Sequence, residues 1–181
     1  MNIVVMGPQG SGKTTQAELL AKKLSSPHIE MGATLRIVAQ EKSGRGKRMR
    51  GLLATGVLIP DAEVLGIIKE RLQSKDCDSG FVLDGIPRTL NQAQKLDEIL
   101  GSIGQQIDRV FYIKVSDETG VKRLVKRGRA DDTPAAIKKR LALYHYETEP
   151  VLQFYREKGI LVELDGEESI EEIRQEIAEK L

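Results

Sequence analysis

The stretch "GPQGSGKTTQ", residues 7–16, follows directly on the apolar run "NIVVM", residues 2–6, and decides the fold. The run has the short β-rich character of a strand, and residues 13–24 repeat apolar side chains at the period of a helix. A glycine-rich turn between a strand and a helix aims backbone N–H groups and the positive end of the helix at one point. That point suits phosphate oxygens.

The same stretch fits the pattern G-x-x-x-x-G-K-[ST] through Gly7, Gly12, Lys13 and Thr14. In this pattern the lysine reaches the terminal phosphates, and Thr14 or Thr15 can touch the shell of a bound Mg²⁺. The alternative, a glycine turn that merely joins a strand to a helix, is disfavoured by the strand-loop-helix context. The sequence therefore predicts a nucleoside triphosphate site, and at this point hydrolysis, switching and transfer all stay open.

A second group of residues lies in "GFVLDGIPRTLNQA", residues 80–93. Asp84 ends a buried-type strand beside the expected phosphate site, where a carboxylate can hold Mg²⁺ through water. A turn or helix-capping aspartate is the alternative. Gly85 and Pro87 shape the chain so that Arg88 points back across the strand ends, the usual ligand location in open parallel sheets.

A third group is rich in arginine and spans residues 123–140. Arginine suits a transferring phosphoryl group because its planar fork neutralises charge spread over several oxygens. A solvated helix face is the alternative, although Arg123 and Arg127 lie one helical turn apart on one face. The arginines of this group are Arg123, Arg127, Arg129 and Arg140.

Strand-like runs alternate with helical stretches along the chain, which predicts a parallel sheet with helices on both faces. The expected strands are 2–6, 28–31, 80–85, 109–115 and 160–164. The expected helices are 13–24, Thr34 into the forties, 61–73, 89–100 and a last one capped by Ser169 and Glu172. The segment "SGRGKRMRG", residues 43–51, is expected to interrupt the helical pattern.

Composition limits the broad class of the protein. With 181 residues and 40% hydrophobic content we expect one main domain. The 28 basic and 27 acidic residues nearly cancel, so we expect neither a nucleic-acid nor a membrane partner. No run approaches the length of a membrane span and the chain enters a strand at once, so we expect a cytoplasmic protein without a signal peptide. The single cysteine, Cys77, excludes an internal disulfide.

Two histidines, His28 and His145, show no pattern of partner residues and are expected to be structural. No Ser/His/Asp or Cys/His set stands out either. Positioning and charge neutralisation, which phosphoryl transfer mainly requires, fit the residues present better than covalent catalysis does.

The order of the motifs resembles that of the adenylate kinases, a group within the nucleoside monophosphate kinases, over essentially the whole chain. The motifs are "GPQGSGKTTQ", "MGATLR", "TGVLIPD", "GFVLDGIPRTLNQA", "RADD", "IKKRL" and "TEPVLQFY". The resemblance implies reversible, Mg²⁺-dependent transfer of the terminal phosphoryl group of ATP to AMP, giving two ADP and balancing the adenine nucleotides. It also implies a monomer with a P-loop NTPase-type three-layer α/β/α fold and a five-stranded parallel sheet.

By resemblance, Arg36 and Arg88 grip the phosphate of AMP, Gln92 hydrogen-bonds the adenine edge and Arg123 stacks on the adenine of ATP. The ATP-binding residues implied are Gly10, Ser11, Gly12, Lys13, Thr14, Thr15, Arg123, Arg127 and Gly166. The AMP-binding residues implied are Met31, Gly32, Arg36, Val57, Leu58, Ile59, Gly85, Arg88, Gln92, Arg129 and Arg140. The catalytic residues implied are Lys13, Asp84, Arg88, Arg123, Arg129 and Arg140, with Asp84 (through water) and Thr14 near Mg²⁺.

The resemblance also divides the chain into parts. The core would comprise 1–29, 60–126 and 141–181, with an insertion at about 30–59 that binds the monophosphate. A very short lid would span about 127–137, because only Gly128 separates Arg127 from Arg129. A four-cysteine zinc lid is excluded, since the chain has one cysteine.

The sequence departs from the family pattern at two places. Thr14 stands where the family usually has glycine, and Glu30, Met31, Gly32 and Ala33 replace the usual Ser-Thr-Gly-Asp stretch. Because that threonine normally lies near the AMP base, Met31 keeps open a kinase for UMP, CMP or another monophosphate. A second alternative is a non-catalytic nucleotide-binding module, for which Arg36, Arg88 and Gln92 have no evident use.

Overall fold

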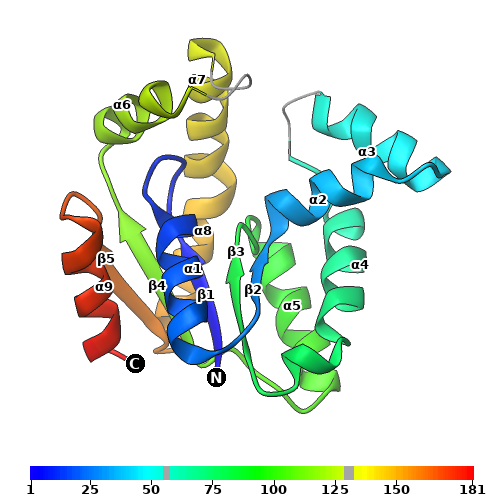
Figure 1. The fold of residues 1–181 in the computed structure, drawn as a ribbon, viewed down its shortest axis with the longest axis horizontal. Helices are drawn as coiled ribbons and strands as arrows, with labels where there is room; N and C mark the ends of the chain where they lie inside the picture. Colours follow the sequence, from blue (N-terminus) through cyan, green and yellow to red (C-terminus); the bar gives the residue numbers. More distant parts are fainter. Residues whose placement is uncertain (55–57, 129–132) are drawn as a thin grey trace.

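A computed structural model describes residues 1–54, 58–128 and 133–181 of the protein. Its centre is a sheet of five strands in the order β2-β3-β1-β4-β5, with every neighbouring pair parallel (Figure 1). The strands are β1 (Asn2–Met6), β2 (His28–Glu30), β3 (Phe81–Asp84), β4 (Arg109–Lys114) and β5 (Leu161–Asp165). The predicted α/β class, parallel sheet and strand positions are confirmed.

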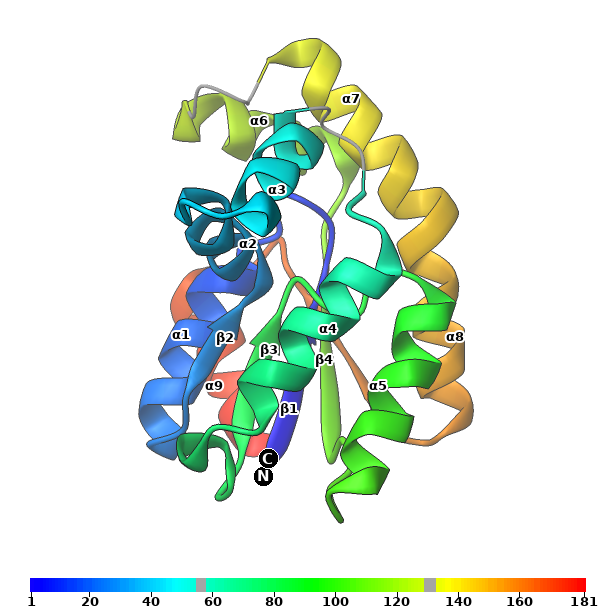
Figure 2. The same cartoon turned by 90° about the vertical axis from the view of Figure 1, so that its right-hand side faces the viewer.

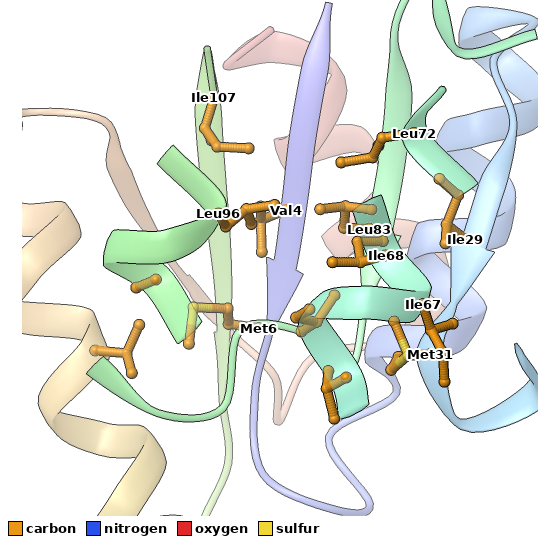
Figure 3. Packing of buried hydrophobic residues seen from close by; sticks show 14 of the residues in the cluster. Val4, Met6, Ile29, Met31, Ile67, Ile68, Leu72, Leu83, Leu96 and Ile107 are labelled. Atoms are coloured by element: carbon orange, nitrogen blue, oxygen red, sulfur yellow. The ribbon is translucent and has the colours of Figure 1, made fainter. Parts of the chain in front are cut away.

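Helices cover both faces of this sheet because its central strands are apolar on both sides. Ile3 and Val5 of β1 pack with α1 (Lys13–Leu24) and α9 (Ile170–Glu179). Val4 and Met6 point to the other face, toward α4 (Asp61–Leu72), α5 (Leu90–Ser102) and α8 (Glu149–Glu157) (Figure 3). Successive side chains of one strand thus point alternately into two hydrophobic cores, one on each face of the sheet, which produces the three-layer architecture.

Several predicted boundaries agree with the structure. α1 begins at Lys13 and ends at Leu24, as its apolar stripe predicts. The Ser169 hydroxyl accepts from the Glu172 backbone N–H while the Glu172 carboxylate accepts from the Ser169 backbone N–H, so the predicted capping box is present. Cys77 lies fully buried in the short 3₁₀ turn Lys75–Cys77.

The predicted interruption at residues 43–51 is wrong. After α2 (Met31–Gln40), a further helix, α3 (Gly44–Ala54), runs through this segment and packs on α2 (Figure 2). Its arginines find tertiary partners on α4: Arg45 pairs with Glu70 at 3.0 Å and Arg48 with Glu63 at 2.6 Å. Long-range contacts therefore hold a helix where the local glycine-rich composition disfavours one.

On the other side of the strand ends, α6 (Asp117–Arg127) and α7 (Pro134–Leu143) rise above the sheet (Figure 1). A π-helical turn, Tyr144–Thr148, connects α7 to α8. Along the described ranges, no helix combines the length and apolar character that crossing a bilayer requires.

Candidate functional site

A cavity of about 270 Å³ lies at the carboxyl ends of the parallel strands. The glycine loop, α2, the ends of β2 and β3, the start of α5 and the arginine-bearing helices α6 and α7 all contribute to its wall. The predicted site residues that line it are Lys13, Thr14, Met31, Gly32, Arg36, Leu58, Ile59, Asp84, Gly85, Arg88, Gln92, Arg127 and Arg140. The fold thus brings most of the three predicted groups to one place, as the switch-point rule for open α/β sheets expects.

The glycine loop has the backbone shape that phosphate binding requires. Gly10 and Gly12 both have φ of 86°, a left-handed conformation that favours glycine. A side chain on Gly10 would also meet the backbone of Gly120, since a Cβ there would lie 2.4 Å from its carbonyl oxygen. No side chain caps the N-terminus of α1 at Gly12, so its first backbone N–H groups remain available to an anion.

Lys13 lies against this loop, with its ammonium donating to the carbonyl oxygen of Pro8 at 3.3 Å. Desolvation in the cavity lowers the pKa of Lys13, and the nearby Asp84 carboxylate opposes that shift. A bound phosphate would supply the negative charge that a partly desolvated ammonium lacks.

Asp84 is 1% exposed at the end of β3, as predicted for a carboxylate at the strand edge. Its Oδ2 accepts a hydrogen bond from the Thr14 hydroxyl at 2.5 Å, while its Oδ1 has no hydrogen-bond partner within the described part of the chain. An orphaned carboxylate oxygen costs free energy unless a ligand satisfies it. The pair therefore fits a Mg²⁺ ion held through water, which needs few protein ligands beside the phosphates.

Arg88 follows Gly85, whose φ of 81° turns the chain back toward the cavity. The Arg88 Nε donates to the Gly85 carbonyl oxygen at 2.9 Å, and the Arg88 backbone N–H donates to the Gln92 Oε1 at 2.8 Å. Desolvation, assisted by Arg140, lowers the pKa of Arg88, although a guanidinium stays charged at neutral pH. A desolvated, anchored guanidinium is a strong partner for a phosphate.

Arg36, from α2, is 54% exposed at its side chain and forms an ion pair of 3.0 Å with Glu30. It lines the cavity as predicted, but a phosphate would have to compete with this carboxylate. Glu30 was not among the predicted site residues. The departure from the family pattern at Glu30 thus has a direct structural consequence.

Arg123 lies outside the cavity wall, behind the glycine loop. Its Nη1 donates to the Gly166 carbonyl oxygen at 2.9 Å and approaches that of Gly10 at 3.5 Å. Gly166 is held in turn by its backbone N–H, which donates to Lys114 at 2.7 Å. Arg123 therefore connects the glycine loop to the turn after β5.

Arg127 of α6 and Arg140 of α7 also line the cavity, and the Arg140 Nε donates to the Ala136 carbonyl oxygen at 3.3 Å. Thr15 is exposed on α1 and does not line the cavity. Val57 and Arg129, predicted from the sequence, lie outside the described residues.

Two further side chains hold residues of the site in place and were not predicted from the sequence. Asp61 accepts hydrogen bonds from Thr89, Asn91 and Gln92, and the only sequence signal at Asp61 is a helix start after Pro60. Glu167 accepts from the backbone and hydroxyl of Ser116, 51 positions away, which no local pattern indicates.

His145 proves to have partners that the sequence analysis did not find. Its two ring nitrogens contact Asp117 at 3.0 Å and Glu149 at 3.2 Å. These carboxylates raise the pKa of His145. The i,i+4 spacing of His145 and Glu149 is the one signal that could have indicated this contact.

A larger groove, of about 570 Å³, lies between α1 and α9. None of the residues with a predicted role lines it, and its charged groups are surface residues such as Lys22, Lys23 and Arg174. The smaller cavity at the strand ends is therefore the candidate active site.

Comparisons with known proteins agree with this geometry. The family model described as Adenylate kinase matches residues 5–160. Adenylate kinase 1 of Synechocystis sp. is 44% identical, covering 94% of this chain and 91% of that protein. Adenylate kinase of Leptospira biflexa is 41% identical over 99% of this chain and 98% of its own length. Adenylate kinase of Caldicellulosiruptor bescii is 36% identical over 100% of this chain and 99% of its own.

The family model matches from the first strand to beyond α8, and the relatives match along nearly the whole chain. The cavity also joins the glycine loop to Asp84 and Arg88. This chain belongs to the adenylate kinase family.

Proposed function

We propose that this chain catalyses reversible transfer of the terminal phosphoryl group of ATP to AMP, giving two ADP. The observation that carries the proposal is that a single cavity is lined by Lys13 of the phosphate loop and by Arg36, Arg88 and Gln92. A protein that only bound or hydrolysed a triphosphate would have no use for a second set of phosphate and base ligands.

On the donor side, the glycine loop and Lys13 hold the ATP phosphates. Arg123 and the backbone near Gly166 form the adenine pocket, since they already contact each other beside the loop. Mg²⁺ bound with ATP would be held through water by Asp84 with Thr14 nearby, and it would neutralise charge on the phosphates.

On the acceptor side, Arg36 and Arg88 hold the AMP phosphate, while Leu58, Ile59 and Gln92 surround its base. An oxygen of the AMP phosphate forms a bond to the terminal phosphorus of ATP as the bond from that phosphorus to the ADP oxygen breaks. The AMP phosphate is already a competent nucleophile, so the protein contributes alignment and charge neutralisation. Arg88, Arg127 and Arg140 all line this cavity and supply positive charge for the transfer.

The same proposal assigns roles to the parts of the chain. Residues 30–59, with α2 and α3, form the insertion that folds over AMP, and residues 127–137 form a short lid over ATP. The core comprises residues 1–29, 60–126 and 141–181. Closure of the two parts excludes water, the competing acceptor.

We further propose that the protein acts as a cytoplasmic monomer with no nucleic-acid or membrane partner. Support for a monomer comes from the cavity, to which the described residues of one chain contribute both donor and acceptor groups. Light scattering coupled to gel filtration tests the monomer, and fractionation of cells that express the protein tests its location.

The enzymatic test measures ADP formation from ATP and Mg²⁺ with each of AMP, UMP, CMP and GMP under one set of conditions. We expect AMP to give the highest kcat/KM and ADP to appear at two molecules for each AMP consumed. A higher kcat/KM for a pyrimidine monophosphate would overturn the assignment of AMP. ADP formation that is independent of every monophosphate would indicate a hydrolysing module instead.

A further inference from the structure

Asp61, the first residue of α4, gathers three side-chain donors from the start of α5. Its Oδ1 accepts from Gln92 Nε2 at 2.7 Å, and its Oδ2 accepts from Asn91 Nδ2 at 2.6 Å and from the Thr89 hydroxyl at 3.0 Å. Asp61 itself does not line the cavity, whereas Gln92 does. The carboxylate therefore acts on the site through the side chain of Gln92.

The two hydrogen bonds of Gln92 determine which way its amide faces. The oxygen accepts from the backbone N–H of Arg88, which can only donate, and the nitrogen donates to the carboxylate of Asp61, which can only accept when ionised. Gln92 is 2% exposed, so solvent offers no replacement for either bond. The reversed amide would place donor against donor and acceptor against acceptor, losing both bonds at once.

The fixed amide still has unused hydrogen-bonding capacity. A primary amide carries two N–H donors and two acceptor lone pairs, and among the residues that the structure describes each polar atom of Gln92 uses one of these. One N–H and one lone pair remain, and the fixed amide determines which position of a bound base each of them can meet. Adenine offers the complementary pair, an amino donor at C6 beside the acceptor N1, whereas hypoxanthine offers a carbonyl acceptor at C6 beside a donor at N1.

We propose that Asp61 is a specificity-determining positioning residue, which fixes the amide of Gln92 so that the acceptor site selects a 6-amino purine over a 6-oxo purine. This inference rests on the proposed function, in which Gln92 contacts the base of AMP. It goes further by assigning base selection to a residue that does not touch the substrate.

The neighbourhood of Met31 increases the importance of this arrangement. Met31 is 2% exposed within the core cluster above β2, and its thioether provides no hydrogen-bond donor. The side chain at this position therefore cannot donate to a base. Gln92 carries base selection, and Asp61 determines its orientation.

The test compares AMP with IMP, which differ only at C6 and N1 of the base. kcat/KM is measured for both acceptors with the wild type and with Asp61→Ala, Asn91→Ala and Gln92→Ala. We expect the wild type to favour AMP by about 100-fold or more, because a site built to hydrogen-bond strongly rejects the mismatched analogue. Asp61→Ala should reduce the ratio of the two kcat/KM values by about tenfold, mainly through KM for the monophosphate, and leave KM for ATP unchanged.

Asn91→Ala is the matched control, because it removes another partner of Asp61 and leaves the bond between Asp61 and Gln92 in place. It should keep the ratio within about twofold of the wild type. Since both acceptors are assayed on the same preparation, the ratio does not depend on the fraction of folded enzyme. If Asp61→Ala does not fold, Asp61→Asn replaces it and should reduce the ratio by at least about threefold, because a neutral acceptor holds the amide less firmly.

The inference is overturned if Gln92→Ala loses selectivity while the Asp61 variant keeps the wild-type ratio. It is also overturned if the wild type uses AMP and IMP equally, a result that leaves phosphoryl transfer itself intact. Absence of transfer to AMP by the wild type would instead overturn the proposed function, and with it the inference. Failure of the inference alone is thus distinguishable from failure of the function.

Discussion

The hydroxyl of Thr14 donates to the carboxylate of Asp84 over 2.5 Å, which joins the first turn of α1 to the end of β3. The two residues lie 70 positions apart in sequence. Their contact is what makes the glycine loop and the second motif parts of one site. Asp84 is almost fully buried, so the bond also stabilises the fold in the absence of nucleotide.

We expect Thr14→Val to lower the free energy of unfolding by about 1–3 kcal/mol, because it removes the partner of a buried carboxylate. The melting temperature without ligand should fall by several degrees, measured by differential scanning calorimetry. Thr15→Val is the matched control, since Thr15 is exposed and has the same shape. Equal melting temperatures for the two variants would contradict this role of the Thr14–Asp84 bond.

Arg88→Ala should reduce kcat/KM for AMP by about tenfold or more, because a charge-assisted hydrogen bond to phosphate is lost at a desolvated site. KM for ATP should change much less. The assay varies AMP at saturating ATP. Arg174→Ala removes an exposed arginine paired with Glu171 on α9 and should leave both constants unaltered. Activity of Arg88→Ala within threefold of the wild type would show that Arg88 does not hold the phosphate.

Glu30→Gln should lower KM for AMP by about two- to fivefold, since the phosphate no longer competes with Glu30 for Arg36. The size follows from the small free energies of exposed ion pairs, about 0.2–1 kcal/mol. Glu41→Gln, which removes the same charge after the end of α2, is the control. An increase in KM would mean that Glu30 orients Arg36 for the phosphate rather than competing with it.

His145 should make stability depend on pH. Because Asp117 and Glu149 raise the pKa of His145, its protonated form stabilises the fold. That contribution is fully present below the unfolded pKa of about 6.5 and is lost as pH rises through the higher folded value. We expect His145→Gln to lower the melting temperature at pH 5.5 and to approach the wild type by about pH 9. A constant difference across this range would exclude titration of His145 as the cause.

Glu167→Gln should raise KM for ATP severalfold, because Glu167 holds the start of α6 through Ser116 and Thr119 beside the contact of Arg123 with Gly166. These hydrogen bonds lower the pKa of Glu167. The stability that Glu167 adds to the fold is therefore present above its unfolded pKa of about 4.3 and is lost as pH falls through the lower pKa of the folded state. Glu168→Gln, its exposed neighbour, should leave KM for ATP unchanged. A similar KM for both variants would exclude a positioning role for Glu167.

The fold was largely predictable because its signals are local. The strand at residues 2–6, the helix from Lys13 and the capping box at Ser169 each depend on residues close in sequence. α3 is not predictable from a local pattern because its partners lie far away in sequence: Met49 packs into the core cluster, and Arg45 and Arg48 pair with α4.

The residues of the candidate site likewise fall into those that a local sequence pattern predicts and those that it does not. Lys13, Asp84 and Arg88 follow strands or loops that the pattern identifies, and the structure places them around one cavity. Asp61, Glu30 and Glu167 could not be identified as parts of the site, because each acts through a contact with another side chain or a distant loop. Which carboxylate faces which donor is settled only by the folded chain.

The strand order has a consequence for biosynthesis. β1 leaves the ribosome before the other strands of this sheet, yet its neighbours are β3 and β4, so it has no partner until residues beyond Phe81 have been made. At a synthesis rate of about 5–20 residues per second, this apolar segment stays unpaired for several seconds. A nascent chain stalled before residue 81 should therefore bind holdase chaperones through β1, and one released after residue 114 should not bind them.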